Sequence, residues 1–227
     1  MKTIGLVVAM TKEIMPFLER QSGKVEKLSD FPFETYSLEI NGKRTVCVKS
    51  GVGEVFAAAA TQYLITKYSP EIIVNFGVCG SLTDNFDVKE IAIVGGVAYY
   101  QFDTSAIDGT KVGQYTGEDD VIMYTDKNLA EKARKILGGK TPITICASSD
   151  KFVADEGEKK RLREDFNAEI CEMESAGVLI TARNSNVPCL IIKGVSDGKG
   201  GAEEYLKMVS MASEKCAEIV TGLCGEL

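Results

Sequence analysis

The sequence predicts an α/β protein built as three layers, with a mixed, largely parallel central sheet flanked by helices. Apolar, β-branched runs alternate with segments of helical periodicity through most of the chain. Two strand-like runs at 33–40 and 44–50 are joined by an Asn-Gly-Lys turn, which is typical of an antiparallel hairpin that widens such a sheet. The 227 residues, 44% of them hydrophobic, suit one domain over 1–227 with a sizeable core.

The first strand and helix follow from local patterns. Residues 3–9 form a continuous apolar run, which is typical of a strand buried on both faces. A helix is expected from about Thr11 as its N-cap, with Ile14 and Phe17 on one face. Pro16 lacks a backbone donor, so the regular part of this helix is expected to begin near it.

The later elements are predicted from the same two periodicities. Further strands are expected at 71–77, 90–100, 143–148, 168–173 and 188–198. The stretch 50–68 is expected to be a glycine-containing turn that opens an alanine-rich helix, and further helices are expected at 126–137, 155–165, 174–184 and 202–221. The polar stretch 103–119 has few hydrophobic anchors and is expected to be a long surface or active-site loop.

Composition excludes several classes of function. The chain has no histidine, so nucleophile systems that depend on histidine and most zinc sites are excluded, and acid–base chemistry falls to Asp, Glu, Lys, Tyr or Cys. The formal net charge of -7 would repel a nucleic acid, and the basic run at 159–164 is read as a solvated helix face.

Cysteine usage and hydropathy indicate the compartment. The seven cysteines form no Cys-x-x-Cys pair and lie mostly in apolar stretches, so they are expected to be buried, reduced thiols. No segment approaches the roughly 20 apolar residues of a membrane span, and the N-terminus does not resemble a signal peptide. We therefore expect a soluble, cytoplasmic protein that binds neither membrane nor nucleic acid.

Polar side chains recur where predicted strands end, which is where α/β sheets bind ligands. Several carboxylates at these points would create an acidic pocket. The residues concerned are Glu13, Asn75, Asp150, Glu172, Glu174, Ser196 and Asp197. Glu172 and Glu174 flank Met173, and on a strand both would point to one face, where like charges repel.

Each of these residues also has a purely structural interpretation. Asp197 is compatible with a turn cap or with a catalytic role, and Glu13 and Glu174 with acids that complement a helix dipole. Phe152 is compatible with a core aromatic or a stacking platform for a flat ligand. The glycines at 76–82 are compatible with an ordinary strand-to-helix turn or with close approach of backbone to a ligand.

Six motifs taken together are more specific. They are GLVVAMTKEI, SGVGEVFAA, VNFGVCGSL, SSDKFV, CEMESAGV and GVSDG. Their order and spacing resemble the 5′-methylthioadenosine/S-adenosylhomocysteine nucleosidases, which belong to the purine nucleoside phosphorylase and uridine phosphorylase superfamily. The resemblance spans nearly the whole chain and implies a phosphorylase/hydrolase-like fold.

The resemblance implies roles for the residues that would carry the reaction. Glu13 matches the glutamate that activates the attacking water, and Asp197 matches the aspartate that protonates adenine N7, with Ser196 beside it. Glu174 matches the carboxylate that holds the ribose hydroxyls, and Met173 the methionine packed under the sugar. Such chemistry requires Asp197 to keep its proton near neutral pH and Glu13 to be ionised.

The resemblance also implies residues that shape the cavity. Phe152 matches the residue that stacks on adenine, and the backbone of Val153 matches the one that hydrogen-bonds the base edge. Gly80 matches the glycine whose backbone approaches the ligand, while Met10 and Val52 would line the same cavity.

The implied activity is hydrolysis of 5′-methylthioadenosine, S-adenosylhomocysteine or 5′-deoxyadenosine to adenine and a 5-substituted ribose, in methionine salvage and nucleoside catabolism. No metal and no organic cofactor are expected. Phosphorylases of the superfamily usually carry a phosphate-binding arginine where this chain has Asn75, which favours water as the nucleophile. A purine nucleoside phosphorylase and a non-catalytic nucleoside-binding protein are the alternatives.

The resemblance further implies a homodimer, in which part of the 103–119 loop could reach the partner's pocket. Several positions differ from the usual pattern, among them the glycine turn at 77–81, Ser149 and the two that follow. Lys193 stands where the family often has arginine, and Tyr205 is the nearest match to the aromatic residue that closes the 5′ end. No role is implied for Glu172 beyond pairing with a nearby cation.

Overall fold

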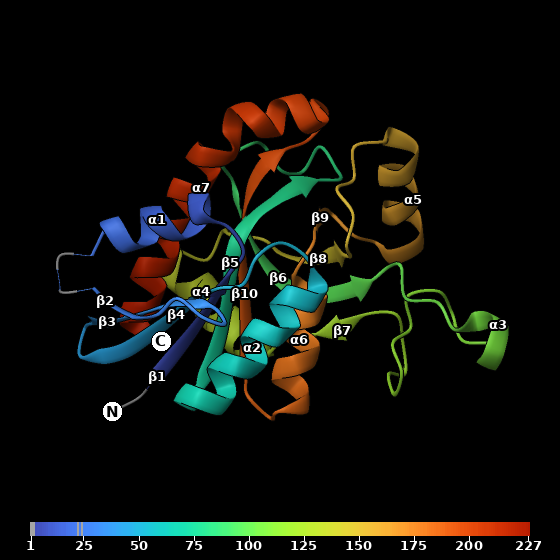
Figure 1. Cartoon of the computed structure of the whole chain (residues 1–227). Coiled ribbons are helices and arrows are strands. Elements are labelled where there is room, and N and C mark those ends of the chain that lie inside the picture. Colours follow the sequence, from blue (N-terminus) through green and yellow to red (C-terminus); the bar gives the residue numbers. More distant parts are fainter. Residues whose placement is uncertain (1–2, 22, 24) are drawn as a thin grey trace.

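The computed structural model describes residues 3–21, 23 and 25–227. Figure 1 shows their strands and helices. The strands are β1 (Thr3–Val8), β2 (Glu26–Ser29), β3 (Glu34–Ile40), β4 (Lys43–Lys49), β5 (Ile72–Ser81), β6 (Ile91–Tyr99), β7 (Met123–Tyr124), β8 (Ile143–Ser148), β9 (Ile170–Glu172) and β10 (Cys189–Asp197). The helices are α1 (Thr11–Glu19), α2 (Glu54–Tyr68), α3 (Ser105–Asp108), α4 (Lys127–Ile136), α5 (Glu156–Phe166), α6 (Ser175–Asn184) and α7 (Gly201–Glu226).

The strands form one mixed sheet. β1 pairs in parallel with β4 and β5, β5 with β10, and β8 with β6 and β9. The β3–β4 hairpin extends the sheet, and its turn residues Asn41 and Gly42 both have positive φ, as the sequence signal requires. Because β5 pairs with both β10 and β9, the strands β10, β6, β8, β9 and β5 close into a circuit. The α/β fold with a mixed sheet is confirmed.

Helices cover both faces of the sheet (Figure 1). On one face, α1 and α7 pack through side chains such as Phe17 and Val220 in one apolar cluster. On the other face, α2 and α6 pack through Leu64 and Leu179 in a second cluster. The alanines of α2 leave its backbone close to α6, and this approach places the starts of both helices beside the carboxyl ends of β8 and β9.

The observed helix α1 differs from the prediction at its start. Met10, and not Thr11, occupies the N-cap, and Pro16 lies inside the helix instead of at its beginning. The carboxylate of Glu13 accepts the backbone N–H of Met10 at 2.8 Å, so the helix start is stabilised ahead of the proline.

The glycine-rich stretch 76–82 is not a turn. β5 continues through it to Ser81, because β10 pairs with it in parallel as far as Gly80. β2 was not predicted, since its four residues carry no apolar run. The segment 103–119 is a loop as expected, apart from the short helix α3, and Figure 1 shows it projecting from the body of the molecule.

The cysteine prediction agrees with the structure. All seven cysteines are buried and none forms a disulfide. Among the helices of residues 3–21, 23 and 25–227, none has the length and apolar content needed to cross a bilayer.

Candidate active site

One pocket gathers all but one of the residues to which the family resemblance assigns a role in the reaction or a place in the cavity. It lies at the carboxyl ends of β5, β9 and β10. The expected residues that line it are Met10, Glu13, Val52, Gly80, Phe152, Met173, Glu174, Ser196 and Asp197. Val78, Cys79, Cys171, Glu172 and Tyr205 complete the lining. The side chain of Val153 is buried in a separate apolar cluster with Leu82 and Leu162 and does not line the pocket, whereas the expectation for Val153 concerns its backbone.

Glu13 is fixed by the backbone on both of its carboxyl oxygens. Oε2 accepts the N–H of Met10, and Oε1 accepts the N–H of Val78 from β5, each at 2.8 Å. Burial raises the pKa of Glu13, while these two N–H groups and the charge of Lys193 oppose the rise. A Cβ atom on Gly77 would lie 2.5 Å from Oε1, so the glycine leaves the space that the carboxylate fills.

Asp197 is the last residue of β10, where the pairing with β5 becomes irregular. Its Oδ1 accepts a hydrogen bond from the Ser196 hydroxyl at 2.7 Å, and its Oδ2 lies 3.0 Å from where a Cβ on Gly80 would stand. Burial raises the pKa of Asp197, and the Ser196 hydroxyl and the charge of Lys159 partly oppose this rise. A buried carboxyl of this kind is suited to donate a proton.

The turn after Asp197 is held from two helices. The buried ammonium of Lys159 in α5 donates to the carbonyl of Gly198. From α7, Glu204 accepts the N–H of Gly198 at 2.7 Å and of Gly200 at 3.2 Å. These contacts fix the direction in which the end of β10 presents Asp197.

Glu174 and Glu172 do not share a face as a strand would require. Glu172 ends β9, whereas Glu174 is the N-cap of α6. Glu174 turns toward α2, where its Oε1 accepts the N–H of Gly53 at 3.0 Å. Burial, followed by the charge of Glu172, raises the pKa of Glu174 to about 8.

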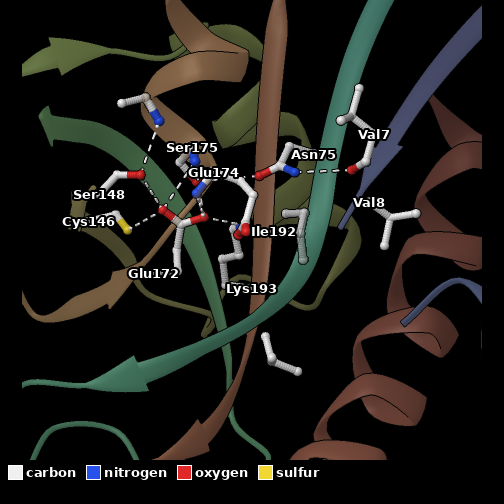
Figure 2. A network of polar contacts seen from close by, with 12 residues as sticks. Val7, Val8, Asn75, Cys146, Ser148, Glu172, Glu174, Ser175, Ile192 and Lys193 are labelled. Atoms are coloured by element: carbon white, nitrogen blue, oxygen red, sulfur yellow. Dashed lines mark hydrogen bonds and ion pairs between the residues drawn. The ribbon is translucent and has the colours of Figure 1, made fainter. Parts of the chain in front are cut away.

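Glu172 pairs with the buried cation of β10, as Figure 2 shows. Its Oε2 lies 2.7 Å from Lys193 Nζ, and it also accepts the N–H groups of Glu174 and Ser175 and the hydroxyl of Ser148. Burial alone would raise the pKa of Glu172, but Lys193 and these hydrogen bonds lower it. Burial alone would lower the pKa of Lys193, and Glu172 and Glu174 raise it.

Two aromatic side chains that contact each other line the pocket. The ring centroids of Phe152 and Tyr205 are 5.5 Å apart at an interplanar angle of 69°. The Tyr205 hydroxyl lies 3.5 Å from the sulfur of Met10. Because Phe152 is 40% exposed, one part of its ring is available to a ligand.

Two polar residues predicted at strand ends lie outside the pocket. Asn75 is buried in the middle of β5, and its amide donates to the carbonyl of Val7 at 3.0 Å (Figure 2). Asp150 is exposed and accepts the N–H of Glu54 at 2.7 Å. Asn75 is in mid-strand because β5 is longer than predicted, and Asp150 serves as a cap for α2.

Glu54 was missed by the sequence analysis, which expected only a glycine turn followed by a helix in its stretch. It is only 4% exposed and contacts Ser148 and Gly177 next to the pocket wall. A glutamate in a first helical turn is usually solvated, so no local pattern identified it. Within the described part of the chain, no group of His, Cys, Asp or Glu side chains could hold a metal ion.

Comparisons with known proteins agree with this geometry. A profile of the phosphorylase superfamily matches residues 3–224, and the chain belongs to that superfamily. It is 29% identical to the aminodeoxyfutalosine nucleosidase of Campylobacter jejuni over 100% of both chains. It is 27% identical to the 5′-methylthioadenosine/S-adenosylhomocysteine nucleosidase of Staphylococcus aureus, covering 95% of this chain and 97% of the relative.

A solved structure points to the same group. The 5′-methylthioadenosine/S-adenosylhomocysteine nucleosidase of Neisseria meningitidis, in complex with methylthio-immucillin-A, is 27% identical and superposes with a TM-score of 0.93 over 100% of both chains. Within the superfamily, the chain therefore groups with the nucleosidases.

Proposed function

We propose that this protein hydrolyses the N-glycosidic bond of a 5′-substituted adenosine, releasing adenine and a 5-substituted ribose. The observation that carries the proposal is that Glu13, Glu174 and Asp197, from α1, the start of α6 and the end of β10, line one pocket. The names of the relatives support it, since they are nucleosidases.

The proposed proton donor to the leaving base is Asp197. Breaking the bond leaves negative charge on adenine, so a neutral acid at N7 lowers the barrier. Burial raises the pKa of Asp197, which favours the protonated form that this role requires. Phe152 would stack on the base, and the backbone of Val153 would bind its edge.

Glu174 and Glu13 are the carboxyl groups that we assign to the ribose side of the pocket. Positive charge develops on the sugar in an oxocarbenium-like state, so an ionised Glu174 at the ribose hydroxyls stabilises it. The pKa of Glu174 is about 8 in the ligand-free pocket, and the cationic sugar would lower it as the bond breaks. Glu13, whose pKa is raised by burial, would act as the base that deprotonates water.

Water is favoured over phosphate as the nucleophile. None of the described residues that line the pocket is a lysine or arginine, so nothing there would neutralise a phosphate. Adenine release in phosphate-free buffer tests this choice, because a purine nucleoside phosphorylase would be inactive there. Tight adenosine binding without cleavage in either buffer would instead indicate a nucleoside-binding protein.

Four 5′-substituted adenosines are the candidate substrates. 5′-Methylthioadenosine and S-adenosylhomocysteine stand in the name of the relative from Staphylococcus aureus, and aminodeoxyfutalosine in that of the relative from Campylobacter jejuni. 5′-Deoxyadenosine is kept from the sequence analysis. Comparing kcat/KM across these four compounds identifies the preferred one.

Replacing Asp197 with asparagine tests the mechanism. Asp197→Asn keeps the shape and the acceptor for Ser196 but carries no transferable proton, so adenine release should fall by about 10²- to 10⁴-fold. Circular dichroism and the melting temperature should show a folded protein. Adenine release at the wild-type rate would contradict the assignment of Asp197 as the acid.

We further propose a cytoplasmic homodimer with one nucleosidase-like domain over 1–227, acting in methionine salvage and nucleoside catabolism without metal or organic cofactor. The exposed apolar side chains of Val55 and Phe56, near the pocket residue Val52, support an interface beside the pocket. In such a dimer the 103–119 loop would reach the partner's pocket.

A further inference from the structure

Glu54, the first residue of α2, is a buried carboxyl without a cationic partner among the described residues. Its Oε2 accepts the N–H of Gly177 in α6 at 2.5 Å, and its Oε1 lies 2.5 Å from the hydroxyl oxygen of Ser148. An ionised carboxylate with no countercharge at such depth is costly. The contacts of Ser148 indicate how that cost is avoided.

The Ser148 hydroxyl oxygen has three polar neighbours. Ala176 donates its N–H to it at 3.2 Å, and carboxyl oxygens of Glu54 and Glu172 each lie 2.5 Å away. A hydroxyl has one hydrogen, so Ser148 can donate to only one of the two carboxyl groups. The other must bring its own hydrogen, because two acceptors would otherwise face each other at hydrogen-bonding distance.

Glu54 is the carboxyl that carries the hydrogen. Glu172 is ionised, since its Oε2 pairs with Lys193 at 2.7 Å and it accepts two backbone N–H groups (Figure 2). Burial, followed by the charge of Glu172, raises the pKa of Glu54 to about 8. The titratable groups around it are Glu172 of β9, Glu174 before α6, Asp150 after β8, Tyr99 at the end of β6, Tyr100 directly after it, and Lys193 of β10 beyond Glu172.

We propose that Glu54 is a positioning residue for the ribose end of the pocket and that it works as a neutral carboxylic acid. Its hydrogen goes to Ser148, the hydrogen of Ser148 goes to Glu172, and its second oxygen holds the start of α6 at Gly177. Side chains from other elements thus satisfy the first N–H groups of α6, at Ser175, Ala176 and Gly177.

This network also holds Glu174. The N–H that binds Glu174 belongs to Gly53, the residue directly before Glu54. A neutral Glu54 therefore keeps the starts of α2 and α6 together, with the Glu174 carboxyl between them. Ionisation of Glu54 would place a second negative charge beside Glu172 and separate the two helix starts. The consequence for catalysis rests on the proposed function, whereas the protonation of Glu54 does not.

Thermal unfolding of the unliganded protein tests the protonation. Glu54→Gln is neutral at every pH and retains one donor and one acceptor, and Glu19→Gln on exposed α1 is the matched control. Because wild-type Glu54 holds its proton only when folded, the advantage of Glu54→Gln in melting temperature should grow from pH 5 to pH 8. A pH-independent difference between Glu54→Gln and wild type would overturn the proposal.

A second measurement follows the titration in the wild-type protein itself and uses a variant only to assign the resonance. With ¹³C-labelled glutamate side chains, the carboxyl resonance absent from Glu54→Asp belongs to Glu54. Its titration midpoint should lie above pH 7. A midpoint near the ordinary glutamate value of about 4.3 would overturn the assignment.

Kinetics test the positioning role. At pH 6.5, Glu54→Ala should lose about tenfold or more in kcat/KM for 5′-methylthioadenosine, and Glu54→Gln should recover most of that loss because it keeps the neutral contacts. If Glu54→Gln and Glu54→Ala lost kcat/KM equally while Glu54→Asp retained it, a charged carboxylate would be required at this position. That result would overturn the positioning role of a neutral Glu54. Absence of adenine release from the wild type would refute the proposed function while leaving the melting and titration results to decide the protonation of Glu54.

Discussion

The two ends of the pocket treat buried carboxyl groups in opposite ways. At the end that presents Asp197, one carboxyl lies beside one hydroxyl, and the nearby cation Lys159 binds the following turn instead of the carboxyl itself. At the end that presents Glu174, the carboxyls of Glu54, Glu172 and Glu174 gather around Lys193 and the starts of α2 and α6.

The difference shows that pairing, and not burial alone, decides the charge of each group. All four carboxyl groups are buried, and burial raises the pKa of Asp197, Glu54 and Glu174. Only Glu172 has its pKa lowered, because it is the one in direct contact with Lys193. A single cation thus divides the crowded end into one ionised group and two groups that titrate near neutral pH.

Breaking the Lys193–Glu172 pair should have the largest effect on stability. Lys193→Met leaves Glu172 buried without its cation, which typically costs about 3–5 kcal/mol of unfolding free energy. Urea denaturation measures the loss. Lys199→Met is the control, because it breaks the exposed pair with Asp84 and should change little. A similar effect of the two variants would contradict the importance of the buried pair.

Replacing Lys159, the cation at the Asp197 end, should have a smaller effect, which appears in catalysis. In Lys159→Met the charge that lowers the pKa of Asp197 is absent, so that pKa should rise further and the alkaline limb of adenine release should move to higher pH. Loss of the contact with Gly198 should lower kcat by about tenfold. Lys160→Met, on the exposed side of α5, is the control. If the alkaline limb of Lys159→Met stayed where it is in the control, the proposed effect of the Lys159 charge on the pKa of Asp197 would be refuted.

The smallest effect is expected for the hydroxyl of Tyr205, which lines the pocket. Tyr205→Phe removes the hydroxyl near the Met10 sulfur but keeps the ring against Phe152. Stability should change by no more than about 0.5 kcal/mol. KM for 5′-methylthioadenosine should change by less than about twofold, since the aromatic surface is retained. A large rise in KM would indicate that the hydroxyl binds the substrate directly.

Local sequence patterns predicted most of the fold. Alternating strand and helix periodicities located the β3–β4 hairpin and β8 closely, because these elements depend on neighbouring residues. The course of β5 through its glycines was predicted wrongly, since it depends on pairing with β10 more than a hundred residues away. For the same reason Asn75 was expected at a strand end and lies in mid-strand.

The site was predicted in part, through positions at strand ends and a family resemblance. Those signals identified Glu13, Glu174 and Asp197, which line the pocket, although their roles in a reaction remain proposals. They did not identify Glu54, because its burial arises from the packing of α2 on α6 and from contacts with Ser148 and Gly177, which are remote in sequence.

Gly77 illustrates how closely backbone and side chain are matched at this site. The place where its side chain would begin is already filled by the Glu13 carboxylate. A single methyl group at position 77 would therefore push Oε1 of Glu13 away from the N–H of Val78, although the substitution removes no polar group. Position 77 can thus gain a side chain only if the Glu13 carboxylate moves or a smaller residue takes its place, whereas position 13 can change while the glycine stays.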